Sequence, residues 1–143
     1  MNDSVNLERF VKAQQNFGTY QTALSEIKNG HKETHWMWYI FPQMLGLGIS
    51  STSQYYAIHS LEEARAFLND PYLGKNLTEI SQALLGLESN NAYSIFGSPD
   101  DLKLRSSMTL FAVAAGEDSV FAKVLDKFFD GKYDAMTLKL LGL

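Results

Sequence analysis

The chain has 143 residues, of which 45% are hydrophobic and 13% aromatic, so it is long enough to bury one core and too apolar for a disordered protein. It contains no cysteine, which excludes disulfides, thiolate metal sites and cysteine nucleophiles, and its three histidines are scattered, so we expect no metal site. The formal net charge of −4 argues against broad nucleic-acid binding, which requires a dominant basic surface.

The first part of the chain predicts two amphipathic helices. Residues 4–16 form the first, with Asp3 or Ser4 as its cap, because a short side-chain oxygen can accept a free amide hydrogen at a helix start. The second begins with Thr19 as its cap, and its apolar residues recur at the i, i+3, i+4 and i+7 spacing of a helix. The asparagine–glycine pair at 29–30 is expected to end it.

Residues 32–48 contain both tryptophans of the chain. We expect Thr34 to cap a short helix over 35–41, and Pro42 to end it, because the residue before a proline disfavours the helical conformation. The glycines within 46–48 then predict a loop. A buried strand is the alternative for the same aromatic residues, but no partner strand is visible elsewhere in the sequence.

The rest of the chain repeats one pattern, in which a short polar residue begins an apolar segment and glycine commonly ends it. The predicted helical segments are 51–58, a helix to Leu68 opened by a capping box of Ser60 and Glu63, a helix from Asp70-Pro71 to about Glu88, 92–96 after Asn91, a helix from Ser98-Pro99 to Ala115, a helix from Asp118 or Ser119 to Gly131, and a last helix after Asp134.

These segments predict an all-α fold with one domain over residues 1–143. Between Leu102 and Ala115 the apolar residues face nearly every direction, so this segment is expected to be the central buried helix. We expect about seven helices around it, several of them short. An α+β arrangement would require the aromatic segment 36–41 to be a strand.

Two blocks of the sequence carry a resemblance to a known family. The matching positions are Lys32, His35-Trp36-Met37-Trp38, Phe41-Pro42-Gln43 and Gly46-Leu47-Gly48 in the first block, Ile95 to Phe111 in the second, and Arg9-Phe10, Gly131, Asp134 and Thr137 outside them. Over nearly its whole length the chain resembles the mostly bacterial family called domain of unknown function 1810. The resemblance implies a compact all-helical fold and brings no established activity. Such proteins sometimes carry the label calpastatin, but a disordered protease inhibitor would not be this rich in aromatic and aliphatic residues.

The aromatic block has two interpretations. Trp36, Trp38 and Phe41 are most simply core residues, because large aromatic side chains bury much apolar area. Alternatively they form a wall against which a base or a sugar stacks. His35 is either a hydrogen-bonded structural residue or a group that titrates near neutral pH and contacts a ligand.

The second block also has two interpretations. On a helix, Lys103, Ser106 and Ser107 lie on one side, with Asp100 one turn earlier. In the structural interpretation Asp100 pairs with Lys103 while the hydroxyls bond back to carbonyls of their own helix. In the functional one, Lys103 and the hydroxyls form an anion site with residues of the first block. No spacing in either block matches a hydrolase motif, so no catalytic residue is assigned.

The resulting hypothesis is a small-molecule-binding domain with a cleft between the two blocks, whose ligand is an anion such as a nucleotide or a sugar phosphate. The predicted ligand-binding residues are Lys32, His35, Trp36, Trp38, Gln43, Lys103, Ser106 and Ser107. The alternative is a protein-interaction or structural domain without chemistry, in which both blocks build the core. The chain shows no nucleotide-loop or metalloprotease motif, no signal peptide and no apolar run near the roughly 20 residues that span a bilayer, so we expect a cytoplasmic protein without a cofactor.

Overall fold

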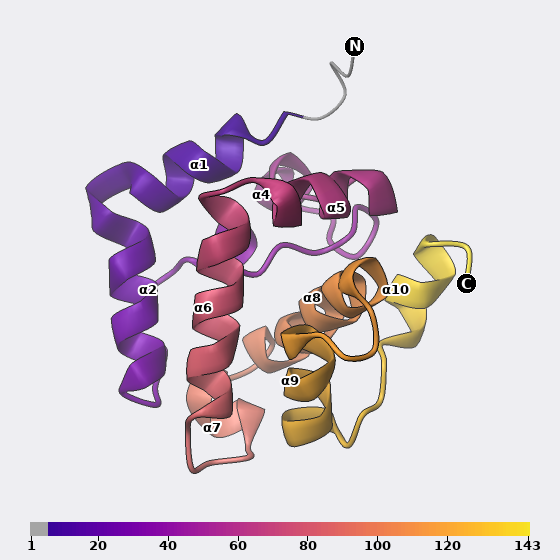
Figure 1. The fold of residues 1–143 in the computed structure, drawn as a ribbon. Coiled ribbons are helices and arrows are strands. Elements are labelled where there is room, and N and C mark those ends of the chain that lie inside the picture. The colour runs from indigo at the N-terminus through magenta and orange to yellow at the C-terminus, as the bar shows by residue number, and fades with distance from the viewer. Residues whose placement is uncertain (1–5) are drawn as a thin grey trace.

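The computed structural model describes residues 6–143, which fold into ten α-helices and one 3-10 helix (Figure 1). The elements are α1 (Glu8–Gln15), η1 (Asn16–Gly18), α2 (Thr19–Lys28), α3 (Met37–Ile40), α4 (Ser51–Tyr55), α5 (Leu61–Asn69), α6 (Leu73–Leu85), α7 (Ala92–Phe96), α8 (Asp100–Ala115), α9 (Val120–Phe129) and α10 (Ala135–Leu140). The all-α prediction is confirmed. The described residues contain ten α-helices rather than about seven, and three of them, α3, α4 and α7, have only four or five residues each.

The aromatic segment is helical rather than extended. No strand occurs in residues 6–143, and the only ladder-like pairing there is an isolated bridge between Met44 and Ile58. The α+β alternative is therefore wrong. The predicted cap of the first helix by Asp3 or Ser4 lies outside the described residues.

Helix α8 lies at the centre of the fold, as predicted. It packs against α5, α7, α9 and α10, and eight of its residues are buried (Figure 1). Leu104, Met108 and Phe111 are fully buried in a core to which nearly every helix contributes. The first turn differs, because Leu102 is 57% exposed. The start of α8 therefore lies at the surface while its remainder fills the core.

A buried polar network joins the N-terminal helices. The Gln14 amide on α1 donates to the carbonyl of Tyr39 at 2.9 Å and accepts from the Asn76 amide of α6 at 3.0 Å. The Tyr20 hydroxyl of α2 donates to the Glu79 carboxylate at 2.6 Å and lies 3.0 Å from the Asn76 carbonyl, both on α6. Burial, and a hydrogen bond to Glu79, raise the pKa of Tyr20. These bonds fix α1, α2, α3 and α6 relative to one another.

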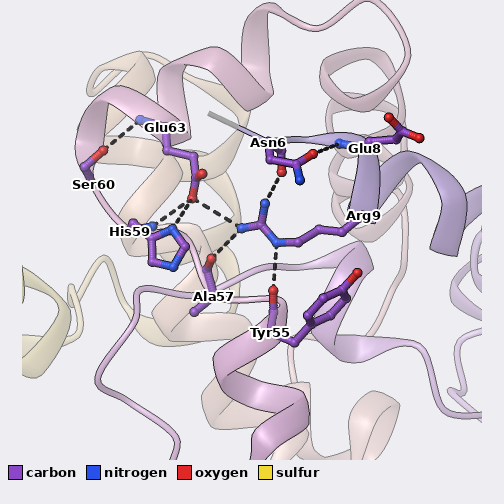
Figure 2. A network of polar contacts seen from close by, with 8 residues as sticks. All are labelled: Asn6, Glu8, Arg9, Tyr55, Ala57, His59, Ser60 and Glu63. Carbon is purple, nitrogen blue, oxygen red and sulfur yellow. Dashed lines mark hydrogen bonds and ion pairs between the residues drawn. The ribbon is translucent and has the colours of Figure 1, made fainter. Parts of the chain in front are cut away.

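Arg9 on α1 binds the segment between α4 and α5 (Figure 2). Its Nε and Nη2 atoms donate to the carbonyls of Tyr55 and Ala57, each at 2.7 Å, and Nη1 donates to the carbonyl of Asn6. Nη2 also lies 3.4 Å from Glu63, whose side chain is 2% exposed. The guanidinium therefore neutralises a buried carboxylate and fixes the loop at the same time.

Glu63 only half fulfils its predicted capping box. Ser60 Oγ accepts from the Glu63 amide at 3.0 Å, as expected for the N-cap of α5. The Glu63 carboxylate, however, accepts from the backbone amide of His59 at 2.8 Å rather than from that of Ser60 (Figure 2). The same carboxylate oxygen also lies 3.4 Å from the Arg9 guanidinium and 3.4 Å from the His59 imidazole.

Side chains cap four helices as predicted, and three predicted caps are wrong. The confirmed caps are Ser60, Asn91, Ser119 and Asp134. Thr19 is the first residue of α2, and its hydroxyl donates to the Asn16 carbonyl. The hydroxyl of Thr34 binds the side chain of Glu26 and leaves α3 without a side-chain cap. Ser98 stands one residue before Pro99, which occupies the N-cap position of α8, and no side chain caps that helix.

Candidate functional site

The carboxylate of Glu26 holds the beginning of the segment 32–48 in place. Its Oε1 accepts from the backbone amides of Glu33 at 2.8 Å and Thr34 at 3.0 Å and from the Trp36 indole at 2.8 Å. Its Oε2 accepts from the Thr34 hydroxyl at 2.6 Å. Burial opposes ionisation of this group, but the four hydrogen bonds outweigh it and lower the pKa of Glu26 to about 2.

Trp36 and Phe41 are core residues. Trp36 is 1% exposed and Phe41 is fully buried. Their ring centroids lie 6.1 Å apart, and both rings pack edge-on against Phe96 of α7, at centroid distances of 6.4 and 6.0 Å. This packing joins the first block to Phe96 at the start of the second block.

The loop after Pro42 is fixed by backbone bonds to Ile58. The Ile58 amide donates to the Gln43 carbonyl at 2.8 Å, and the Leu45 amide donates to the Ile58 carbonyl at 2.9 Å. Glycine is required at position 48, because a Cβ there would lie 2.6 Å from the Ser53 hydroxyl of α4. The close approach of the loop to α4 holds Gln43 and the residues up to Gly48 in one position.

A cleft of about 270 Å³ lies between the two sequence blocks. The first block, the start of α8 and the start of α10 all contribute residues to its lining. The lining residues are Trp38, Gln43, Leu47, Gly48, Pro99, Leu102, Lys103, Ser106, Asp134 and Met136. The cleft thus combines apolar surface with one ammonium group, one carboxylate, one amide and one hydroxyl.

The ammonium group of Lys103 is held above the ring of Trp38. Its Nζ lies 3.9 Å from the ring centroid and 3.3 Å from the Asp100 carboxylate. Asp100 has a closer partner in Lys32, whose Nζ lies 2.9 Å from the other carboxylate oxygen and whose side chain is 8% exposed. Lys32, Asp100 and Lys103 therefore form a cluster of two ammonium groups and one carboxylate, which has a net positive charge. Of the three residues, only Lys103 lines the cleft.

The side-chain amide of Gln43, which also lines the cleft, contains a hydrogen-bond donor without a partner in residues 6–143. Its Nε2 is buried without a hydrogen-bond partner among the described residues. Gln43 also lines a second, small hollow of about 10 Å³ beside the loop. Ser106 Oγ donates to the Leu102 carbonyl at 3.3 Å and remains able to accept a hydrogen bond.

Asp134 is the charged residue of the cleft that the sequence hypothesis missed. The structural interpretation of an N-cap is confirmed, because its Oδ2 accepts from the Thr137 amide at 3.0 Å and from the Thr137 hydroxyl at 2.6 Å. Its own amide donates to the hydroxyl of Thr109 on α8 at 2.8 Å. Asp134 belongs to the positions that carry the family resemblance, and this was the one available signal that it does more than cap a helix.

Four of the eight predicted site residues line the cleft: Trp38, Gln43, Lys103 and Ser106. Lys32 lies behind the lining, paired with Asp100. The remaining three lie elsewhere: His35 is exposed and away from the cleft lining, and Trp36 and Ser107 are buried in the core.

Ser107 corrects both interpretations of the second block. It was expected to share a face with Lys103 and Ser106, or to bond back to its own helix. It is fully buried, and its Oγ has no hydrogen-bond partner in the described part of the chain. The reason is that adjacent helical residues point about 100° apart, so Ser107 turns into the core while Ser106 faces the cleft. Thr109 does bond back, to the Arg105 carbonyl at 2.8 Å.

Residues 6–143 show neither a metal-binding cluster nor a membrane-spanning helix. No group of three or more histidine, aspartate or glutamate side chains is arranged to hold a metal ion within this range. None of the helices described there is both long and apolar enough to span a membrane.

Comparison with known proteins agrees with the fold. A crystal structure described as that of the conserved hypothetical protein Rv1873 from Mycobacterium tuberculosis is 42% identical in sequence and covers 99% of each chain, with a TM-score of 0.93. No curated protein matches the chain significantly. A family model described as protein of unknown function, DUF1810, matches residues 4–141. As the two sequence blocks predicted, the chain belongs to the DUF1810 family.

Proposed function

We propose that this protein binds a small molecule with an anionic group, such as a sugar phosphate or a nucleotide, in the cleft between the two sequence blocks. The observation that carries the proposal is the ammonium group of Lys103, which lies in a concave surface together with the unpartnered amide of Gln43 and an apolar wall. A few polar groups converging in a largely apolar hollow are typical of ligand sites. The proposal includes a cytoplasmic location.

The electrostatics support an anionic group near Lys103. Asp100 is shared with Lys32 at the shorter distance, 2.9 against 3.3 Å, so the positive charge of Lys103 is only partly compensated. Lys103 also lies in the first turn of α8, where the helix dipole is positive. An anion that approaches Lys103 is attracted by both.

The volume limits the size of the ligand. Sites for drug-sized molecules occupy about 300–1,000 Å³. The cleft, at about 270 Å³, lies just below that range. A monosaccharide phosphate fits this space, and of a nucleotide only one part would enter it. The aliphatic side chains of Leu47 and Met136 would contact the apolar face of such a ligand.

A thermal-shift panel of sugar phosphates, nucleotides and simple anions tests the proposal. A ligand at about 100 times its Kd stabilises the native state by about 2.7 kcal/mol, which raises the Tm of a domain of this size by roughly 5–10 °C. Lys103→Met, which retains an apolar stem, should abolish the ligand-induced shift. Lys123→Met removes the same charge from an exposed position of α9 and should retain it.

The outcome that overturns the proposal is the absence of any dose-dependent shift in the wild type, or a shift of the same size in Lys103→Met. The ligand-induced shift is compared within each variant, so a lower starting Tm of the variant does not affect the conclusion.

One observation favours the alternative, a protein-interaction domain. Four exposed apolar side chains lie on the two blocks and α10: Leu45 (40% exposed), Leu102 (57%), Met136 (50%) and Leu140 (37%). Leu102 and Met136 line the cleft itself, and Leu140 packs against Gly46. Such a surface also suits an apolar side chain of another protein. This alternative predicts that no member of the panel shifts the Tm.

A further inference from the structure

We propose that the ligand of this cleft carries a positively charged amino group in addition to its anionic group, and that Asp134 binds this amino group. The inference rests on the proposed function and specifies its ligand class: small zwitterionic compounds such as amino-sugar phosphates or phosphorylated amino alcohols. The observation behind it is the presence of two opposite charges, those of Lys103 and Asp134, in the lining of one small cleft.

The carboxylate of Asp134 is held rigidly. Its Oδ2 accepts both bonds from Thr137, and its amide is bound to Thr109 of α8 at 2.8 Å. The preceding residues are attached to α8 as well, because Arg105 donates to the carbonyls of Lys132 at 2.9 Å and Tyr133 at 2.8 Å. A side chain fixed in this way loses little conformational entropy when it binds a ligand.

The negative charge of Asp134 is not neutralised by the protein. Among residues 6–143 no lysine, arginine or histidine forms an ion pair with it, and its Oδ1 accepts no hydrogen bond. The neighbouring Arg105 is occupied by two backbone carbonyls. Asp134 therefore contributes a full negative charge and a free acceptor to the cleft.

A purely anionic ligand would meet this charge at close range. The cleft is only about 270 Å³, so a ligand that fills it contacts both the Lys103 wall and the Asp134 wall. An anion without an amino group is attracted by one wall and repelled by the other, whereas a zwitterion in the matching orientation is attracted by both. Repulsion of the simple anion thereby adds to the selectivity of the site.

The negative charge of Asp134 is not needed to cap α10. Capping and the proposed binding of an amino group can therefore be tested separately. Asparagine caps helices about as well as aspartate, because its side-chain oxygen accepts the same amide hydrogen. Asp134→Asn therefore retains the bonds to Thr137 and removes the charge. Circular dichroism and thermal melting of the variant check that its fold is intact.

The test is isothermal titration calorimetry with two pairs of probes: glucosamine 6-phosphate against glucose 6-phosphate, and phosphoethanolamine against glycerol phosphate. In the wild type the amino compound of a pair should bind about tenfold more tightly or better, which corresponds to one charge-assisted hydrogen bond. In Asp134→Asn this preference should disappear while the phosphate compounds still bind. In Lys103→Met both members of a pair should bind more weakly.

Three results would overturn the inference, and they differ in what else they refute. If both members of each pair bind the wild type equally, the amino group is not recognised, while the proposed anion site stands. If the preference persists in Asp134→Asn, another group binds the amine. If no probe binds the wild type, the proposed function fails as well. The comparison of probes in the wild type decides whether the amino group is recognised even if the variant does not fold.

Discussion

Replacing Glu26 by glutamine tests how the aromatic block is held. The carboxylate is 7% exposed and accepts four hydrogen bonds, from two backbone amides, the Thr34 hydroxyl and the Trp36 indole. Glutamine has nearly the same shape but only one acceptor oxygen, and its amino group points at groups that are themselves donors. We expect Glu26→Gln to fold and to lose about 2–4 kcal/mol of unfolding free energy at neutral pH, because buried donors are left unpaired.

The pKa of Glu26 reflects the same four hydrogen bonds and gives a magnitude for the stabilisation of the charged carboxylate. It falls from an ordinary 4.5 to about 2, a difference that corresponds to about 3 kcal/mol at about 1.4 kcal/mol per pKa unit. Because the pKa is lower in the folded state, this stabilisation is fully present above the unfolded-state pKa. It is lost progressively as the pH falls from about 5 towards 2.

Urea unfolding followed by far-UV circular dichroism, at pH values from about 7 to about 3, measures both effects. The wild type should lose stability over this range more steeply than Glu26→Gln, since the variant lacks the titrating group. Glu8→Gln is the control, because Glu8 is exposed and forms only a surface pair with Lys12 at 3.0 Å. Equal stability of Glu26→Gln and wild type at neutral pH, or parallel pH profiles, would refute the reasoning.

The other predictions concern the cleft and its supports. Gln43→Met removes an unpaired buried donor, so it should leave unfolding free energy unchanged or raise it by up to about 1 kcal/mol while weakening ligand binding; a clear loss of stability in urea titrations would contradict this. Arg9→Met leaves Glu63 buried without its cation and should cost about 3 kcal/mol, part of which a second change, Glu63→Gln, recovers in thermal melts if the charge is the cause. Gly48→Ala should cost about 1–3 kcal/mol, because the added Cβ meets Ser53, and Ser53→Gly should restore stability if that contact is responsible.

Local signals predicted most helices correctly. Asn91, Ser119 and the other confirmed caps act through an amide two or three residues away, so the sequence contains both partners of each bond. Two departures from the predicted caps involve more distant partners. The hydroxyl of Thr34 binds Glu26, eight residues back across a turn, and the Glu63 carboxylate lies next to Arg9, 54 residues away. Spacing along the chain contains no information about such partners.

The sequence predicted which two blocks form the candidate site. It did not predict which side chains within each block face the cleft. Within each block, residues of the lining alternate with residues of the core: Trp38 faces the cleft and Trp36 the core, Ser106 the cleft and Ser107 the core. Adjacent residues of a helix point in different directions, so only one of two neighbours can face the cleft. Because α8 is apolar on nearly every side, its sequence does not reveal which side of the helix faces the cleft. That direction is set by where the loop at 43–48 and the start of α10 meet α8.

Lys32 illustrates why a motif residue outside the cleft still determines its chemistry. Its ammonium group lies 5.0 Å from the centroid of the Trp36 ring and 2.9 Å from Asp100, between the two sequence blocks. If Asp100 were paired with Lys103 alone, the two charges would cancel and the cleft would present only the carboxylate of Asp134. Because Lys32 shares Asp100, Lys103 keeps a positive charge to set against Asp134. The zwitterionic character proposed for the ligand therefore depends on a buried lysine that does not line the cleft.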